Sequence, residues 1–285
     1  MKTVLIALLA ASALVAQGVA AQQGAGALDR IKASKTINVA YSPDALPFSF
    51  KGANGPDGYS IDLCKRVISQ IGRATAVPDL KVNWIAGSTP ERLQLVASGK
   101  ADLECGNTSQ TLPRLANVDF SGLIFLDAGG FMVRVDSKVE RFDDMGAKKI
   151  GVLKGTTTEA SVRDALKRRM VNATVVQFGD PAEAVKALDA GSIDVFAGDK
   201  VRLVGLAAQA KDPTQYALLV EELSYEPYAF ALPRNDSALR LEVNRALSQV
   251  YMGGEIETIF GQWLGKLGRP TGLLAAMYLL YSIPE

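Results

Sequence analysis

The sequence of 285 residues contains no histidine and only two cysteines, Cys64 and Cys105. Without histidine, the chain has no Ser-His-Asp or Cys-His catalytic site and no metal site that uses imidazole ligands. Two cysteines are too few for a cysteine-based zinc site, so we expect neither a metal nor another cofactor. In an exported chain the pair could form a disulfide, but the sequence leaves open whether the two residues meet.

The chain also lacks an excess of either charge, with 31 basic residues, 30 acidic residues and a net charge of +1. No strongly basic surface is therefore expected, which argues against a nucleic-acid partner. Hydrophobic residues make up 48% and charged residues 21% of the sequence, as in globular proteins. The length is sufficient for two lobes of ordinary size, and we expect a monomer.

The sequence has no apolar run of the length that a membrane span needs. A shorter apolar run lies near the amino end. There, Lys2 precedes an apolar run from Val4 to Val15, and small residues follow up to Ala21. This order predicts a secretory signal peptide over residues 1–21, with cleavage after Ala20 or Ala21 and export to the periplasm. A membrane anchor is the alternative interpretation, but the run is short for a membrane span.

What the chain does contain is a regular alternation of short apolar runs with amphipathic stretches. We expect strands at 36–41, 81–87, 101–106, 148–155, 173–179, 193–199 and 225–233. We expect helices at 59–72, 89–100, 156–170, 180–191, 236–254 and 255–266. Thr89, Thr156 or Thr157, and Asp180 are the expected helix caps. Strands that alternate with helices predict an α/β fold with a parallel or mixed sheet covered by helices.

The alternation restarts near residue 148, which predicts two α/β lobes. We place lobe 1 at 30–128 plus 229–285 and lobe 2 at 129–228, with extended crossings near 128–133 and 222–228. Ligands of such folds collect where strands end at their carboxyl side. The loop CGNTSQTLPR (105–114), the turn GTTTE (155–159) and Asp199 all follow strands, so we expect them to share one site.

Six motifs then occur in order along the chain. They are PFSF (47–50), GYSIDLC (58–64), GKADLECGNTSQTLPR (99–114), IGVLKGTTTE (150–159), GSIDVFAGD (191–199) and GQWLG (261–265). Together they resemble the extracytoplasmic solute-binding proteins of polar-amino-acid ABC transporters, and most closely the glutamate/aspartate branch. The resemblance implies a type II periplasmic binding protein fold, in which two α/β lobes joined by two crossing strands close on a ligand. It also implies an amino-acid ligand and an ABC membrane permease as the partner.

The resemblance assigns the main ligand contacts to residues of both lobes. It implies that Arg114 binds the α-carboxylate, which suits the bidentate hydrogen bonds of a guanidinium group. Thr156 and Thr157 would complete that site from the second lobe, where a helix start favours an anion. Asp199 would pair with the α-ammonium group. The alternatives are an ordinary surface arginine at 114, and helix capping for the threonines and for Asp199.

The remaining candidates would surround the ligand's α-carbon and side chain. The resemblance places Asn107 and Ser109 beside the α-carbon. Thr89 and Arg92 match positions that contact a side-chain carboxylate in the glutamate/aspartate branch. Arg92 also fits the first turn of a solvated helix. Phe48 would form a wall of the pocket, although an aromatic residue on a strand is also typical of a core.

Two departures from the glutamate/aspartate branch affect the expected ligand. Ser42 stands where that branch has an arginine, and Phe178 stands where it has a histidine. A less positive pocket would admit neutral or larger amino acids, while glutamate and aspartate stay the leading candidates.

Two other classes of function are compatible with this fold. The first is a periplasmic dehydratase of the cyclohexadienyl type, which needs a buried acid in the cleft, for which Glu104 and Glu226 are the conceivable donors. The second is a ligand-sensing subunit that acts through a membrane partner. We expect a binding protein rather than an enzyme, because recognition of a zwitterion by Arg114 and Asp199 needs no unusual protonation state.

Overall fold

The computed structural model describes residues 26–284, so the expected signal peptide at 1–21 lies outside the described residues. Within this range, nine strands form one mixed sheet in the order β5-β1-β6-β12-β7-β10-β8-β9, with β11 beside β7. These strands are β1 (Thr36–Tyr41), β5 (Lys81–Ala86), β6 (Leu103–Glu104), β7 (Asp119–Arg134), β8 (Lys149–Leu153), β9 (Thr174–Phe178), β10 (Val195–Asp199), β11 (Tyr216–Leu218) and β12 (Ser224–Leu232). A separate small sheet contains β2 (Asp44–Ala45), β3 (Ser49–Gly52) and β4 (Gly55–Asp57).

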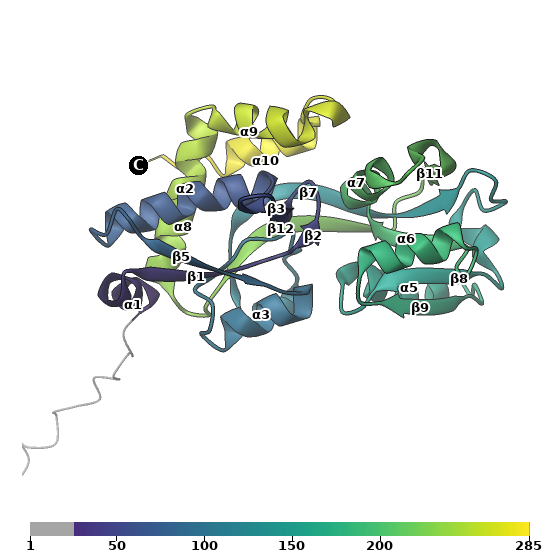
Figure 1. Cartoon of the computed structure of the whole chain (residues 1–285), viewed down its shortest axis with the longest axis horizontal. Coiled ribbons are helices and arrows are strands. Elements are labelled where there is room, and N and C mark those ends of the chain that lie inside the picture. Colours follow the sequence, from purple (N-terminus) through teal and green to yellow (C-terminus); the bar gives the residue numbers. More distant parts are fainter. Residues whose placement is uncertain (1–25, 285) are drawn as a thin grey trace, which may run out of the picture.

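Helices cover the large sheet on both faces, as Figure 1 shows. They are α1 (Ala27–Ser34), α2 (Tyr59–Ala74), α3 (Thr89–Ala97), α4 (Leu112–Leu115), α5 (Thr157–Arg168), α6 (Pro181–Asp189), α7 (Lys200–Gln209), α8 (Ser237–Met252), α9 (Glu255–Leu264) and α10 (Gly272–Leu280). Every predicted strand and helix is confirmed, with shorter limits in several cases. Within residues 26–284, none of the helices has the length and apolar character needed to cross a membrane.

The direction of the strands confirms the mixed sheet. β1 runs parallel to β5 and β6, and β8 runs parallel to β9 and β10. By contrast, β7 runs antiparallel to β12 and to β10. The two parallel groups therefore lie on either side of the antiparallel pair formed by β7 and β12.

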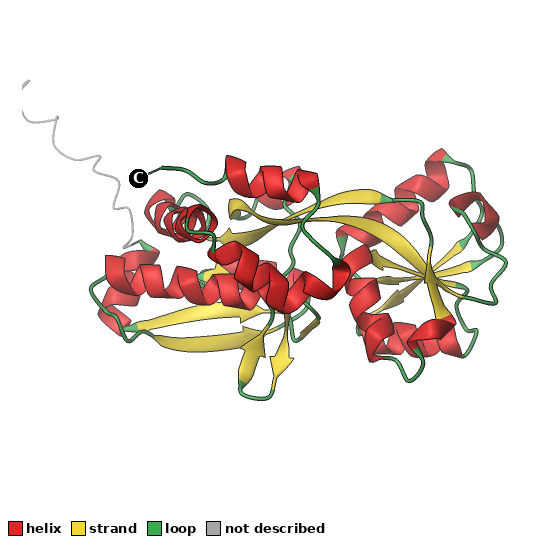
Figure 2. Ribbon diagram, turned by 90° about the horizontal axis from the view of Figure 1, so that it is seen from above, coloured by secondary structure: helices red, strands yellow, loops and turns green. Residues whose placement is uncertain are grey.

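The pair of β7 and β12 joins two separately packed bodies (Figures 1 and 2). The largest apolar core contains residues from Ala27 to Phe125 and from Tyr228 to Tyr278. A second core draws on residues from Phe131 to Leu219. The residues at 128–133 lie in β7, and those at 222–228 include the start of β12.

Nearby side chains cap the starts of α3, α5 and α6. Thr156 accepts a hydrogen bond from the backbone N–H of Glu159, and Asp180 accepts one from that of Ala182, so both predicted caps are confirmed. The prediction of Thr89 as a cap was wrong, because α3 begins one residue earlier. Ser88 precedes α3, and its backbone N–H donates to the Glu91 carboxylate at 2.8 Å. This reciprocal cap leaves Thr89 in the first turn.

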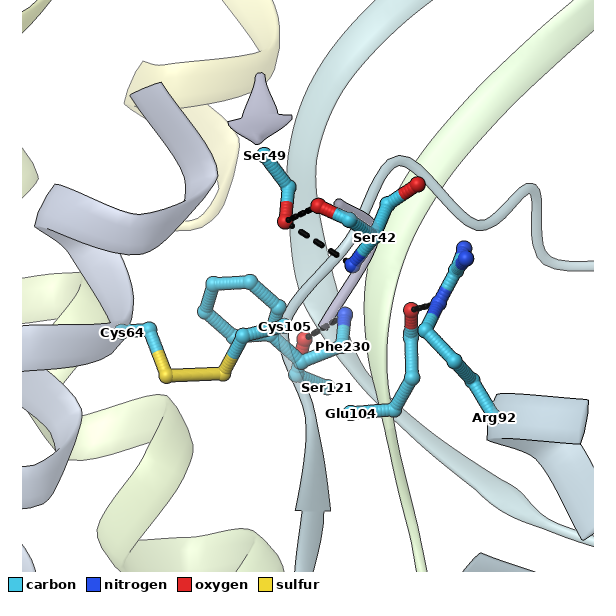
Figure 3. The surroundings of a disulfide bond; sticks show 8 residues. All are labelled: Ser42, Ser49, Cys64, Arg92, Glu104, Cys105, Ser121 and Phe230. Atoms are coloured by element: carbon cyan, nitrogen blue, oxygen red, sulfur yellow. Dashed lines mark hydrogen bonds and ion pairs between the residues drawn. A yellow bond between two sulfur atoms is a disulfide. The ribbon is translucent and has the colours of Figure 1, made fainter. Parts of the chain in front are cut away.

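Cys64 and Cys105 form a disulfide bond that ties α2 to the end of β6 (Figure 3). Their Cα atoms lie 6.0 Å apart, although the two residues are 41 positions apart in the sequence. Both cysteines are fully buried. The bond therefore fixes the point at which the polar loop 106–111 leaves the sheet.

Candidate functional site

The loop that follows β6 is held against β12 by backbone hydrogen bonds. The Gln110 N–H donates to the Pro227 carbonyl at 2.8 Å, and the Ala229 N–H donates to the Thr108 carbonyl at 3.1 Å. The side chains of Asn107 and Ser109 are buried as a result. Small polar residues at the carboxyl end of β6 are thus fixed next to the crossing strand.

A polar cavity lies between the strand ends of the two bodies. Its lining from the first body is Thr89, Asn107, Ser109 and Arg114. Its lining from the second body is Leu153, Thr156, Thr157, Thr158, Ala197, Gly198, Asp199 and Arg202. Seven of the nine candidate residues from the sequence therefore meet here, while Arg92 and Phe48 do not.

Arg114 lines the cavity from α4, and its guanidinium group has one hydrogen-bond acceptor among residues 26–284. Nη1 donates to the Ser109 carbonyl at 2.7 Å. No carboxylate among the described residues lies within ion-pair distance, so Arg114 forms no salt bridge there. Burial lowers the pKa of Arg114, an effect that the charges of Glu104 and Glu226 oppose. A ligand carboxylate is the natural partner for such a buried cation.

Asp199 ends β10 and is surrounded by hydrogen-bond donors. Oδ1 accepts from the Thr158 hydroxyl at 2.9 Å. Oδ2 accepts from the Tyr228 hydroxyl at 2.5 Å and from the Asn107 amide at 3.4 Å. The side chain makes no capping hydrogen bond to α7, so the alternative interpretation of Asp199 as a side-chain cap was wrong. The bond from Asn107 connects the two bodies across the cavity.

Glu226 forms a second connection between the two bodies. It lies on β12, buried, and Oε2 accepts from the Ser109 hydroxyl at 2.5 Å and from the Thr157 hydroxyl at 2.7 Å. Oε1 accepts from the Ser224 hydroxyl at 2.6 Å. Burial, together with the charge of Asp199, raises the pKa of Glu226. From the sequence, Glu226 was a candidate only as an acid, because Ser109 and Thr157 come from distant segments.

Arg92 lies behind the cavity in a buried ion pair with Glu104 (Figure 3). Its side chain is only 1% exposed, and Nε donates to Glu104 Oε1 at 2.7 Å. Nη1 donates to the Gly87 carbonyl at 2.8 Å. The interpretation of Arg92 as part of a solvated helix was therefore wrong. Its guanidinium group is committed to Glu104, which does not favour the contact with a ligand that the resemblance implied.

Phe48 belongs to the apolar core rather than to the cavity wall. It is fully buried, and its ring packs edge-on against Tyr59, Phe125 and Tyr228. Because Tyr228 donates to Asp199, Phe48 supports the site from one layer behind it. The alternation of apolar residues in PFSF was the correct signal for a core position.

Asp127 on β7 is a further buried carboxyl group beside Asp199. It accepts hydrogen bonds from the Val201 N–H at 3.2 Å and the Tyr228 hydroxyl at 3.2 Å. Burial is the main cause that raises the pKa of Asp127 to about 7, and the negative charge of Asp199 adds to it. In the unfolded chain the group has its ordinary, lower pKa. The folded state therefore binds this proton more tightly, and the resulting stabilisation is lost as the pH rises through about 7.

We expect Asp127→Asn to stabilise the protein at about pH 8 by on the order of 1–2 kcal/mol, because it removes the cost of a buried charge. At about pH 4.5 the gain should vanish, since the wild-type carboxyl group is then protonated. Urea unfolding at both pH values measures the difference. Asp164→Asn, at an exposed position on α5, is the matched control. An equal effect of Asp127→Asn at both pH values would contradict the prediction.

No group of three or more acidic or cysteine side chains in the described part of the chain is arranged to hold a metal ion. The charged cavity-lining residues are Arg114, Asp199 and Arg202. Such a set can bind a small charged molecule through ion pairs and hydrogen bonds. Arg202 was missed because no helix was predicted directly after Asp199. Thr158 belongs to the predicted GTTTE turn, but only its neighbours Thr156 and Thr157 were selected as ligand contacts.

Comparison with known proteins places the chain among amino-acid-binding proteins. Residues 37–266 match the bacterial extracellular solute-binding proteins, family 3. An L-glutamate/L-aspartate-binding protein of Pseudomonas aeruginosa is 29% identical over 264 residues, which cover 92% of this chain and 87% of that protein. An ancestral arginine-binding protein bound to arginine is 27% identical, with a TM-score of 0.73 and coverage of 81% of this chain and 99% of that chain.

A third relative bears on the enzymatic alternative. It is an ancestral amino acid-binding protein described as a precursor of cyclohexadienyl dehydratase, 26% identical, with a TM-score of 0.71. The matched region covers 84% of this chain and 99% of that chain. These relatives are named for different ligands, glutamate and aspartate in one case and arginine in another. The ligand side chain must therefore be inferred from residues of this chain.

Proposed function

Because the chain belongs to family 3 of the bacterial extracellular solute-binding proteins, we propose that it captures an α-amino acid and delivers it to the membrane permease of an ABC importer. We also propose that it acts in the periplasm as a monomer. Its lobes are taken to be 30–128 plus 229–285 and 129–228. The observation that carries the proposal is one cavity lined by Arg114 from the first lobe and Asp199 from the second.

The cavity has the charges that recognition of a zwitterion requires. Arg114 binds the α-carboxylate through parallel hydrogen bonds, and Asp199 binds the α-ammonium group. The start of α5, where Thr156 and Thr157 line the cavity, adds the positive end of the helix dipole. Asn107 and Ser109 surround the α-carbon. None of these groups forms or breaks a covalent bond in this role.

Ligand binding and lobe closure are coupled, because the two charged ends of the ligand are bound by different lobes. A ligand favours the closed state only through contacts that the open state lacks. Glu226 supports closure by accepting from Ser109 of lobe 1 and Thr157 of lobe 2. The permease would then recognise the closed form.

We expect Asp199→Asn to weaken binding of α-amino acids by about tenfold or more, because it removes the partner of the ammonium group. Acids that lack the amino group should lose much less. Isothermal titration calorimetry with an amino acid and its deaminated counterpart measures both losses. Asp194→Asn, outside the cavity, is the matched control. Equal losses for the two ligands would contradict the role of Asp199.

The competing function is a dehydratase, favoured by the raised pKa of the buried Glu226 and by the dehydratase precursor among the relatives. Glu226 is, however, held by the hydroxyl groups of Ser109, Thr157 and Ser224. We expect purified protein to leave prephenate and arogenate unchanged, while a thermal-shift panel of amino acids detects a ligand. Turnover of either compound would overturn the proposal of a pure binding protein.

A further inference from the structure

Arg202 is a cavity-lining cation to which neither the motifs nor the relatives assign a role. It lies in the first turn of α7, three residues after Asp199, so both side chains project from the same end of that helix. The side chain is only 12% exposed. A long cationic side chain that is buried at a polar cavity needs a partner to offset its desolvation.

The protein provides Arg202 with a weak partner. Its Nη2 forms an ion pair with Asp44 Oδ1 at 3.5 Å, and the Asp44 side chain is 41% exposed. Ser42 donates to the same oxygen at 3.0 Å, so the guanidinium group of Arg202 lies beside Ser42. Water screens a single long contact of this kind, and such pairs contribute little. The guanidinium group therefore retains most of its capacity to bind a second carboxylate.

The charges around the cavity favour a ligand with one net negative charge. The charged side chains that line it are Arg114, Asp199 and Arg202, with a net charge of +1. An amino-acid backbone satisfies the first two and leaves Arg202. Four other carboxylates lie nearby, outside the lining. Asp44 is the half-exposed partner of Arg202, and Asp127 accepts hydrogen bonds from Val201 and Tyr228. Glu104 is paired with Arg92, and Glu226 accepts hydrogen bonds from the hydroxyl groups of Ser109, Thr157 and Ser224.

We propose that Arg202 is the specificity-determining residue, which binds the side-chain carboxylate of an acidic amino acid. This inference rests on the proposed function. Arg202, which belongs to the second lobe, would then make the contact with the side-chain carboxylate that the resemblance implied for Arg92. Thr89 supports the same end of the ligand, because it lines the cavity in the first turn of α3, where the helix dipole favours an anion.

The test compares acids with their uncharged amides, which have nearly the same shape. Calorimetry would use L-glutamate, L-aspartate, L-glutamine and L-asparagine as probes with wild-type protein and Arg202→Gln. Two controls accompany them. Arg168→Gln removes an exposed arginine of α5, and Asp44→Asn removes the protein partner of Arg202.

We expect wild-type protein to prefer an acid over its amide, and Arg202→Gln to reduce that preference by about tenfold or more, the effect of a charge-assisted hydrogen bond. Affinity for the amides should change little. Both controls should keep the wild-type preference, and Asp44→Asn should keep or increase it.

Each contrary outcome has a separate meaning. Wild-type protein that binds amino acids without preferring acids would overturn the inference and leave the proposed function standing. The same holds if Arg202→Gln keeps the full preference for acids, because Arg202 would then not bind the side-chain carboxylate. It also holds if Asp44→Asn is the variant that abolishes the preference, because the preference would then depend on Asp44 and not on a direct contact of Arg202 with the ligand. Wild-type protein that binds none of these probes nor any other amino acid would overturn the proposed function, and the inference with it.

Discussion

Replacing Arg114 with alanine is expected to abolish measurable binding of every α-amino acid while the fold stays intact. Two charge-assisted hydrogen bonds to the α-carboxylate contribute about 1.5–3 kcal/mol each. Their loss, about 3–6 kcal/mol, would weaken binding at least a hundredfold. The effect should not depend on the ligand's side chain, because every α-amino acid presents the same carboxylate. This separates Arg114 from Arg202, for which the loss should be confined to acids.

The stability of the Arg114→Ala variant distinguishes a binding role from a structural one. Arg114 has no ion-pair partner among the described residues, and its burial disfavours the charge, as its lowered pKa indicates. We therefore expect a melting temperature close to that of wild-type protein, together with an unchanged circular dichroism spectrum. Arg168→Ala, at an exposed site on α5, is the matched control for loss of an arginine. Unchanged amino-acid affinity in well-folded Arg114→Ala protein would refute the assigned role.

The parts of the fold that depend on local chemistry could be predicted from the sequence. Apolar periodicity located the strands and helices, because each element must bury one face. Caps at Thr156 and Asp180 followed from side chains that bond the backbone within three residues. The one error of this kind, Thr89 in place of Ser88, arose because two hydroxyl residues are adjacent and only Ser88 is reached by Glu91.

The candidate site was predictable where residues at strand ends act alone. Arg114 and Asp199 line one cavity as expected, since strand ends of an α/β sheet meet at one edge. The relationships between distant side chains were not predictable. The pairing of Arg92 with Glu104 and the position of Arg202 both depend on how strands and helices pack, which local patterns do not specify. Glu226 was likewise recognisable as a connection between lobes only after Ser109 and Thr157 were placed beside it.

The ion pair of Arg92 with Glu104 should matter more for stability than any exposed pair in the protein. Both side chains are essentially inaccessible, at 1% and 0% exposure. Breaking such a pair on one side leaves an uncompensated buried charge, which typically costs about 3–5 kcal/mol. We expect that loss in the free energy of unfolding of Arg92→Met, measured by urea denaturation. Lys65→Met removes the partner that Asp57 and Asp62 share at the surface, and should cost about 0.5 kcal/mol or less.

A double variant separates the ion pair's contribution to stability from its contribution to ligand binding. Arg92→Met with Glu104→Leu replaces both charges by apolar side chains of similar size, so much of the lost stability should return. If Arg92 only shapes the protein behind the cavity, the stable double variant should also keep its affinity for amino acids and its preference for acids. If the double variant is stable but no longer binds acids more tightly than amides, Arg92 would be the residue that binds the ligand's side-chain carboxylate. Because Gly106 leaves no room for a β-carbon, which would lie 2.4 Å from Glu104 Oε1, the charged pair and the cavity loop are packed as one unit.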